Sequence, residues 1–197
     1  RGVVAAVVPW NFPVMSAISK IAPALAVGNT VVLKPSECSP RSAARLAELA
    51  TEAGLPPGVL NVVQGSGAIV AKELALHQDV NMIAFTGSTA VGKLILQYAG
   101  QSNMKVAHVE CGGKSPQIVF ADCHNLIEVT DNIVETILLN QGQLCVAGLR
   151  ILVEQKIELP LRVSIAERLK KFAVGDPLDP DVCFGPLANR QQMEKVL

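Results

Sequence analysis

Runs of β-branched and apolar residues alternate with segments of helical periodicity through the first half of the chain, and this alternation constrains the fold most. Strands alternating with helices of this length are typical of βαβ units, in which a parallel sheet is buried on both faces. The sequence therefore predicts an α/β fold. We expect strands at 3–8, 30–33, 59–63, 80–85 and 105–109, and helices at 13–28, 39–54, 65–77 and 87–98.

The alternation changes after Gly112-Gly113, a pair with the backbone freedom of a hinge. With 197 residues, and about 150 residues per domain as a guide, the chain has room for one domain and part of another. We expect a first domain at 1–112 and part of a second at 113–197. The second part is expected to contain strands at 117–120 and 150–153, helices at 126–139, 164–172 and 189–197, and a loop at 175–186.

The charges balance, because 17 Lys and Arg residues stand against 17 Asp and Glu residues. A chain without a field of one sign does not gather nucleic acid or anionic lipid, so neither is expected as a partner. Apolar residues make up 50% of the chain, yet no run reaches the roughly 18 consecutive apolar residues of a spanning helix. The first residues show no signal-peptide pattern, which favours a cytoplasmic protein.

The five cysteines stand at scattered positions: Cys38, Cys111, Cys123, Cys145 and Cys183. An odd number, without a C-x-x-C pair or a nearby pair of histidines, argues against a disulfide framework and against a zinc site. No metal is therefore expected. A lone cysteine is most often a small buried hydrophobe, and we expect this of every cysteine except Cys145.

A glycine-rich segment, Gly87-Ser-Thr-Ala-Val-Gly92-Lys93, follows a predicted strand and opens a predicted helix, as a phosphate-binding P-loop does. Leu94 follows it, so the hydroxyl that binds Mg²⁺ in a P-loop is missing. A glycine-rich turn at a helix N-terminus still presents free N–H groups to a phosphate or diphosphate. Taken alone, the two glycines favour a tight turn, and a P-loop ATPase is a further interpretation.

Five short motifs occur in order along the chain: Pro9-Trp-Asn-Phe-Pro13, Lys34-Pro-Ser-Glu37, Phe85-Thr-Gly-Ser-Thr89, Glu110-Cys-Gly-Gly-Lys-Ser-Pro116 and Asn140-Gln-Gly-Gln-Leu-Cys145. Together they resemble the aldehyde dehydrogenase superfamily, and the resemblance runs from Gly2 to the end of the chain. It implies a Rossmann-like NAD-binding domain, without its N-terminal part, followed by the opening of an α/β catalytic domain. The implied reaction is the NAD-dependent oxidation of an aldehyde to a carboxylic acid.

The resemblance assigns the chemistry to three residues. Cys145 is the implied nucleophile, since the thiolate forms a thiohemiacetal that expels hydride and leaves a thioester. Asn11 and the backbone N–H of Cys145 are the implied oxyanion donors. Glu110 is the implied general base, which activates the water that hydrolyses the thioester. From the residues alone, Asn11 is equally a turn residue between two prolines, and Glu110 equally a member of an ion pair.

The resemblance also assigns the cofactor site. Lys34 and Glu37 are the implied ligands of the adenosine ribose, and a carboxylate there favours NAD over NADP. The glycine-rich segment is the implied phosphate site. Further cofactor-binding positions are Trp10, Gly67, Phe85, Gly87, Ser88, Thr89, Ala90, Val91, Gly92 and Cys111. Core packing explains Trp10 and Phe85 equally well, and the family usually has Leu at position 111.

Within the family, the stretches at 102–105, 118–122 and 145–148 are similar to the branch that acts on γ-glutamylaminobutyraldehyde and related aldehydes. The resemblance implies a small-molecule aldehyde as the substrate and a homo-oligomer as the assembly. It also implies that further segments complete the enzyme, so residues 1–197 alone are not expected to turn over. A nucleotide-binding or structural protein of the same fold, without turnover, is the alternative from another class.

Overall fold

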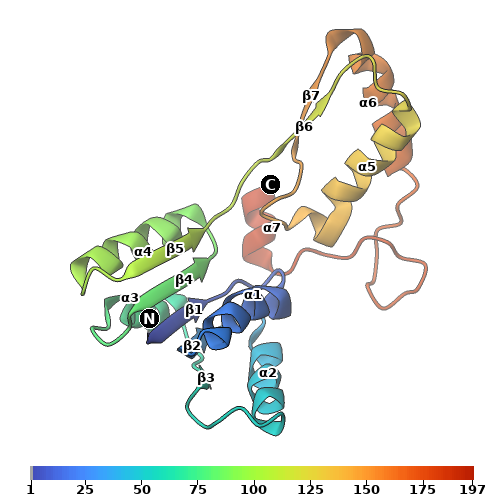
Figure 1. Ribbon diagram of the computed structural model, residues 1–197. Coiled ribbons are helices and arrows are strands. Elements are labelled where there is room, and N and C mark those ends of the chain that lie inside the picture. Colours follow the sequence, from blue (N-terminus) through green and yellow to red (C-terminus); the bar gives the residue numbers. More distant parts are fainter. Residues whose placement is uncertain (1) are drawn as a thin grey trace. The chain divides into compact units, whose positions relative to one another are not determined.

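A computed structural model describes residues 2–197, which form two compact units, one ending at Cys111 and the other beginning at Gly112 (Figure 1). The first unit is built on a sheet of five strands in the order β3-β2-β1-β4-β5. Every neighbouring pair is parallel, which confirms the predicted α/β class. The strands are β1 (Val3–Val7), β2 (Thr30–Lys34), β3 (Leu60–Val62), β4 (Met82–Thr86) and β5 (Val106–Glu110).

Helices cover both faces of this sheet. Successive residues of each strand point to opposite faces, so neighbouring residues pack against different helices. Val4 and Ala6 of β1 pack with α1 (Pro13–Ala26) and α2 (Pro40–Glu52). Their neighbours Ala5 and Val7 pack with α4 (Thr89–Gln101) and with the segment η1 (Gly67–Ala71) and α3 (Lys72–Leu76). The segment at 65–77, expected as one α-helix, opens with a turn of π-helix before α3.

The chain builds this sheet outward from β1 in both directions, first through β2 and β3 and then through β4 and β5. The order therefore reverses between β1 and β4. In open parallel sheets, ligands bind outside the carboxyl ends of the strands at such a switch point. The topology therefore predicts a ligand site among the segments that follow β1, β2, β4 and β5.

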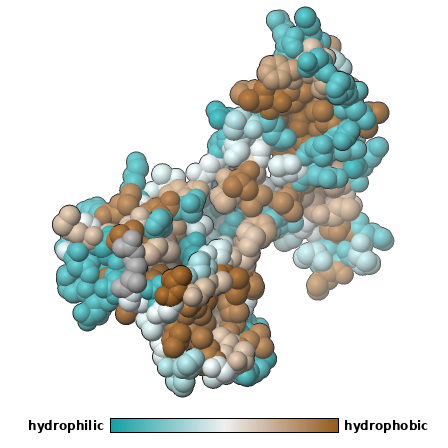
Figure 2. Space-filling view, viewed as in Figure 1, coloured by the Kyte–Doolittle hydropathy of each residue, from teal (hydrophilic) through white to brown (hydrophobic). Residues whose placement is uncertain are grey.

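The second unit is a smaller βαβ arrangement, in which α5 (Leu126–Leu138) connects the parallel strands β6 (Pro116–Val119) and β7 (Arg150–Val153). Helices α5 and α6 (Gln155–Leu169) cover one face, around the buried side chains of Val119, Ile133 and Leu161. A 3-10 turn, η2 (Leu139–Gly142), follows α5, and α7 (Arg190–Val196) ends the unit. The opposite face of the two strands exposes Ile118 and Leu152, and Phe120 directly after β6 is exposed as well. Apolar side chains gather over several parts of the surface in Figure 2, including the part that holds β6 and β7.

Helix α6 begins at Gln155, well before the expected residue 164. Pro160 lies inside it, and a proline in a helical pattern predicts a kink or an end because it lacks an N–H. The helix continues because Leu161, only 1% exposed, packs in the core of this unit. Tertiary packing therefore outweighs the local preference here. Among residues 2–197, no helix combines the length and apolar character needed to cross a bilayer.

The close approach of α4 to β5 predicts opposite effects for two glycine substitutions in the same helix. A Cβ on buried Gly92 would lie 2.6 Å from Cys111 Sγ and 2.8 Å from Val109 Cγ1, whereas one on Gly100 meets nothing within 4 Å. We expect Gly92→Ala to lower the free energy of unfolding by about 1–3 kcal/mol through overpacking. Gly100→Ala should raise it by about 0.5–1 kcal/mol, because Ala suits a helix better than Gly. Urea unfolding measures the free energy of unfolding of both variants. If both substitutions stabilise the protein equally, the close contact between α4 and β5 at Gly92 is contradicted.

Candidate active site

The parallel sheet brings most of the predicted cofactor residues to one edge. Trp10 and Asn11 follow β1, Lys34 is the last residue of β2, Gly87 follows β4 directly, and Glu110 ends β5. The carboxyl ends of parallel strands share an edge, so residues distant in sequence become neighbours there. The backbone N–H of Gly87 donates to the carbonyl of Glu110 at 3.0 Å, which ties two of these strand ends together.

Lys34, Glu37 and Gly67, predicted separately as cofactor residues, form one hydrogen-bonded cluster. Lys34 is only 2% exposed, and its Nζ lies 2.9 Å from Glu37 Oε2. The other carboxylate oxygen, Oε1, accepts a hydrogen bond from the backbone N–H of Gly67 at 2.5 Å. Glu37 itself is about half exposed, with 49% of its side chain accessible. The cluster therefore presents a fixed carboxylate beside a buried cation at the end of β2.

The charge of Glu37 is stabilised within this cluster. Partial burial by itself raises the pKa of the carboxyl, but hydrogen bonds from its own backbone N–H, from Lys34 and from Gly67 outweigh burial. The pKa of Glu37 consequently lies below its ordinary value of 4.5. The carboxylate is therefore ionised at neutral pH, and both of its oxygens act only as hydrogen-bond acceptors.

The glycine-rich turn forms the N-terminus of α4. Ser88 caps the helix, and its Oγ accepts a hydrogen bond from the backbone N–H of Val91 at 3.3 Å. Ser88, Thr89, Ala90 and Val91 are exposed, so the positive end of the helix dipole faces the surface, although the Val91 N–H is already bonded to the cap. Gly87 fits over the ring of Phe85, where a Cβ would lie 2.5 Å from Cζ. Phe85 thus supports the turn from within the core, with 4% of its surface exposed.

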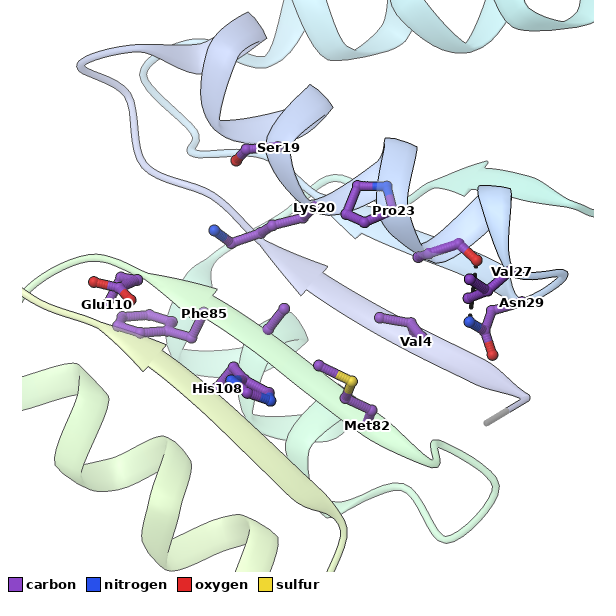
Figure 3. Close-up of a pocket in the computed structure, with 12 residues that line it drawn as sticks. Val4, Ser19, Lys20, Pro23, Val27, Asn29, Met82, Phe85, His108 and Glu110 are labelled. Carbon is purple, nitrogen blue, oxygen red and sulfur yellow. Dashed lines mark hydrogen bonds between the residues drawn. The ribbon is translucent and has the colours of Figure 1, made fainter.

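A cavity of about 430 Å³ lies between α1 and the sheet beside Glu110 (Figure 3). Its walls are mostly apolar, and Lys20, His108 and Glu110 are its ionisable lining residues among those described. Lys20 reaches across from α1, and its Nζ lies 2.6 Å from Thr86 Oγ1 at the end of β4. Burial lowers the pKa of Lys20, while the negative charge of Glu110 acts in the opposite direction.

Sequence reasoning missed Lys20 as a residue of this site. The sequence did contain a signal, because Lys20 is the one charged residue in the α1 segment Pro13–Ala26. A cation in an otherwise apolar helix is costly to bury unless a polar group meets it. Thr86 and the field of Glu110 supply that partner in the fold.

Cys145 belongs to the second unit, in the loop between η2 and β7, and is exposed. The loop before it has an unusual backbone, with φ of 51° at Asn140, 56° at Gln141 and 70° at Gly142. Left-handed conformations cost about 1–2 kcal/mol per residue in side chains other than Gly, and they cluster at functional sites. The combined action of Cys145 with Asn11 and Glu110 stays a prediction, since those residues belong to the first unit.

Exposure does not distinguish Cys145, the predicted nucleophile, from the other cysteines. Cys38 and Cys183 are exposed like Cys145, Cys111 and Cys123 are partly buried, and all five are free thiols. The expectation that the other four are buried hydrophobes is therefore wrong for Cys38 and Cys183, because both stand in exposed turns and loops. Within residues 2–197, no three His, Cys, Asp or Glu side chains gather as metal ligands would.

The family model of the "Aldehyde dehydrogenase family" matches residues 1–197. The chain belongs to the aldehyde dehydrogenase family. It is 49% identical to the NADP/NAD-dependent aldehyde dehydrogenase PuuC of Escherichia coli over 99% of this chain and 39% of that enzyme. This aldehyde dehydrogenase chain thus spans about two fifths of the length of the curated relatives that it matches.

Solved structures of aldehyde dehydrogenases share the fold of this chain. The γ-glutamyl-γ-aminobutyraldehyde dehydrogenase of Burkholderia cenocepacia matches with 53% identity and a TM-score of 0.95, over 99% of this chain and 39% of that one. An indole-3-acetaldehyde dehydrogenase in complex with NAD+ matches with 53% identity and a TM-score of 0.96, over the same shares. Two enzymes named for different aldehydes are therefore equally similar to this chain.

The Glu37 cluster predicts a pH-dependent contribution to stability. Because folding lowers the pKa of Glu37, its stabilisation is complete above pH 4.5, the ordinary value, and disappears as the pH falls through the lowered value. Wild type should exceed Glu37→Gln in unfolding free energy by less than about 1 kcal/mol at neutral pH, since the carboxylate is half exposed. Urea unfolding from pH 7 downward measures the difference, and a difference that does not shrink below pH 4.5 contradicts the ionised cluster.

Proposed function

We propose that this chain carries the NAD-binding domain, residues 1–112, and the nucleophile-bearing part of the catalytic domain, residues 113–197, of an NAD-dependent aldehyde dehydrogenase. The enzyme oxidises a small aldehyde to a carboxylic acid. The observation that carries the proposal is the shared edge of the sheet, where the Lys34, Glu37 and Gly67 cluster and the N-terminus of α4 lie in a member of this family. The substrate's side chain is left open, because equally similar relatives act on different aldehydes.

The residues at this edge fit the two ends of a dinucleotide. The ionised carboxylate of Glu37 accepts hydrogen bonds from ribose hydroxyls, and Lys34, held at 2.9 Å from it, donates to them. At the neighbouring switch point, the exposed first turn of α4, with the positive end of its dipole, and the Ser88 hydroxyl suit a diphosphate. Gly87 and Gly92 let this turn lie close to the sheet. A Cβ on Gly87 would clash with Phe85, and one on Gly92 would clash with Cys111 and Val109.

Cys145 performs the covalent chemistry. Its thiolate adds to the aldehyde carbon, and the resulting thiohemiacetal oxyanion accepts hydrogen bonds from the Asn11 side chain and the Cys145 backbone N–H. Bound NAD supplies the acceptor for the hydride that leaves this carbon. The thioester that remains is hydrolysed by water, from which Glu110 removes a proton. The acid departs and the thiol is restored.

The cavity beside Glu110 gives its carboxylate a polar neighbour. The Nζ of Lys20 donates to Thr86 and is attracted by the negative charge of Glu110, so Lys20 brings a positive charge near the base. Glu110 stands at the end of β5, where the lining of the cavity is otherwise mostly apolar.

The split roles of Cys145 and Glu110 predict different failures in the active enzyme that contains these residues. Cys145→Ala should abolish turnover and leave NAD binding nearly unchanged, because only the covalent step is lost. Glu110→Gln should allow one burst of NADH and then stall, since the thioester persists without a base. Rapid-mixing absorbance at the NADH band measures both. Normal steady-state turnover in Glu110→Gln removes the base assignment, and NAD binding without any turnover in wild type favours a binding protein.

The position of Glu37 predicts a change in cofactor preference. Removing its charge should narrow the preference for NAD, because a carboxylate repels the 2′-phosphate of NADP while it accepts a hydrogen bond from the 2′-hydroxyl. The ratio of kcat/KM for the two cofactors in Glu37→Gln measures this effect. Glu48→Gln is the matched control, since Glu48 pairs with Arg45 on the exposed face of α2. An unchanged ratio in Glu37→Gln would reduce Glu37 to a surface charge.

A further inference from the structure

The segment that leads into Cys145 adopts a backbone that needs outside support. Asn140, Gln141 and Gly142 are all left-handed, and Gln141 has no glycine-like freedom to favour this conformation. Such a turn persists only where surrounding contacts over-determine it. Gly142 is tightly placed, since a Cβ on it would lie 3.2 Å from the carbonyl oxygen of Ile137.

Gln143 supplies contacts on two sides of this turn. Its Nε2 donates to the carbonyl of Asn140 at 3.1 Å, and its backbone N–H donates to the same carbonyl at 3.0 Å. Its Oε1 accepts a hydrogen bond from the backbone N–H of Ala188 at 3.0 Å, across 45 positions of sequence. The residue is buried, with 8% of its surface exposed. One amide therefore fixes the turn and ties it to the segment before α7.

The other side of Cys145 is anchored to the sheet. Gln117 of β6 donates from Nε2 to the carbonyl of Gly148 at 2.8 Å. Ala147 and Gly148 are buried, whereas Cys145 and Val146 are exposed between these two anchors. Gly113 passes close by, because a Cβ on it would lie 3.1 Å from the carbonyl oxygen of Cys145. The thiol thus stands on a short exposed arch held at both ends.

We propose that Gln143 is a positioning residue for the nucleophile, and that its hydrogen bonds to Asn140 and Ala188 set the direction in which the Cys145 thiol points. The inference rests on the proposed role of Cys145. Gln143 stands two residues before Cys145 in the chain. It therefore acts on the thiol through the backbone between them and does not touch the reacting atoms. A displacement of about 1 Å in a reacting group lowers the rate about 100-fold, so a small shift of the arch has a large effect.

The test compares two substitutions in the active enzyme that contains these residues. Gln143→Met keeps the length of the side chain and removes both polar atoms, while Gln143→Glu keeps an acceptor for the Ala188 N–H. We expect kcat to fall by about 10- to 100-fold in both variants, with NAD affinity unchanged. Gln143→Met loses both hydrogen bonds, and Gln143→Glu places a carboxylate oxygen against the carbonyl of Asn140. Asn125→Ala is the control, because it removes the cap of α5 in the same unit without contacting the arch.

A second readout separates misplacement from unfolding. Iodoacetamide labelling, followed residue by residue by mass spectrometry, should still modify Cys145 in Gln143→Met, with exposed Cys38 as the reference thiol. Cys123, which is partly buried against the core of the second unit, should be labelled no faster than in wild type. A reactive Cys145 thiol with lost turnover and unchanged labelling of Cys123 shows a misplaced nucleophile.

Three outcomes overturn the inference. The first is wild-type kcat in Gln143→Met, and the second is an equal loss of kcat in Asn125→Ala. The third is faster labelling of Cys123 than in wild type in both Gln143 variants, which would mean that Gln143 only maintains the fold. Turnover that survives in Cys145→Ala is a different result, because it removes the proposed function itself.

Discussion

The parallel pairing of β1 with both β2 and β4 is the constraint on which the first unit depends. Ala5 and Ala6 of β1 are completely buried, one on each face, and their small side chains let helices pack closely on both sides. Because all five strands run in the same direction, their carboxyl ends meet at one edge. Every candidate cofactor residue of this unit that follows a strand takes its place from that geometry.

The two buried lysines of the sheet, one at each edge, have different kinds of partner. Lys105, before β5, donates to the carbonyl of Ala75 and to Ser102 Oγ, both at 2.6 Å, and burial lowers its pKa. Its partners are neutral and internal, so the lysine joins α3 to the end of α4. Lys34, at the carboxyl edge, instead meets the half-exposed carboxylate of Glu37. A charge pair open to solvent can exchange partners with a ligand, whereas an internal cation serves the structure alone.

The local patterns that predicted the fold correctly were those in which propensity and packing agree. The prolines at the start of α1 and α2 predicted helices, and the continuous apolar run of β1 predicted a strand, all close to the observed bounds. Pro160 is the counterexample, because its local effect favours an end of α6 that the burial of Leu161 overrides. The strand order, with its reversal beside β1, depends on pairings between distant segments and was not readable from periodicity.

By itself, the sequence determined the family, the α/β class and the residue types available for chemistry, because ordered motifs and a period of alternation are local properties of the chain. Only the tertiary structure decided which of these residues meet. It joined Gly67 to Glu37 across 30 positions, brought Lys20 to Thr86 across 66, and tied Gln143 to Ala188 across 45. Hydrogen bonds of this kind form between groups that have no sequence relation, so their partners are fixed by packing alone.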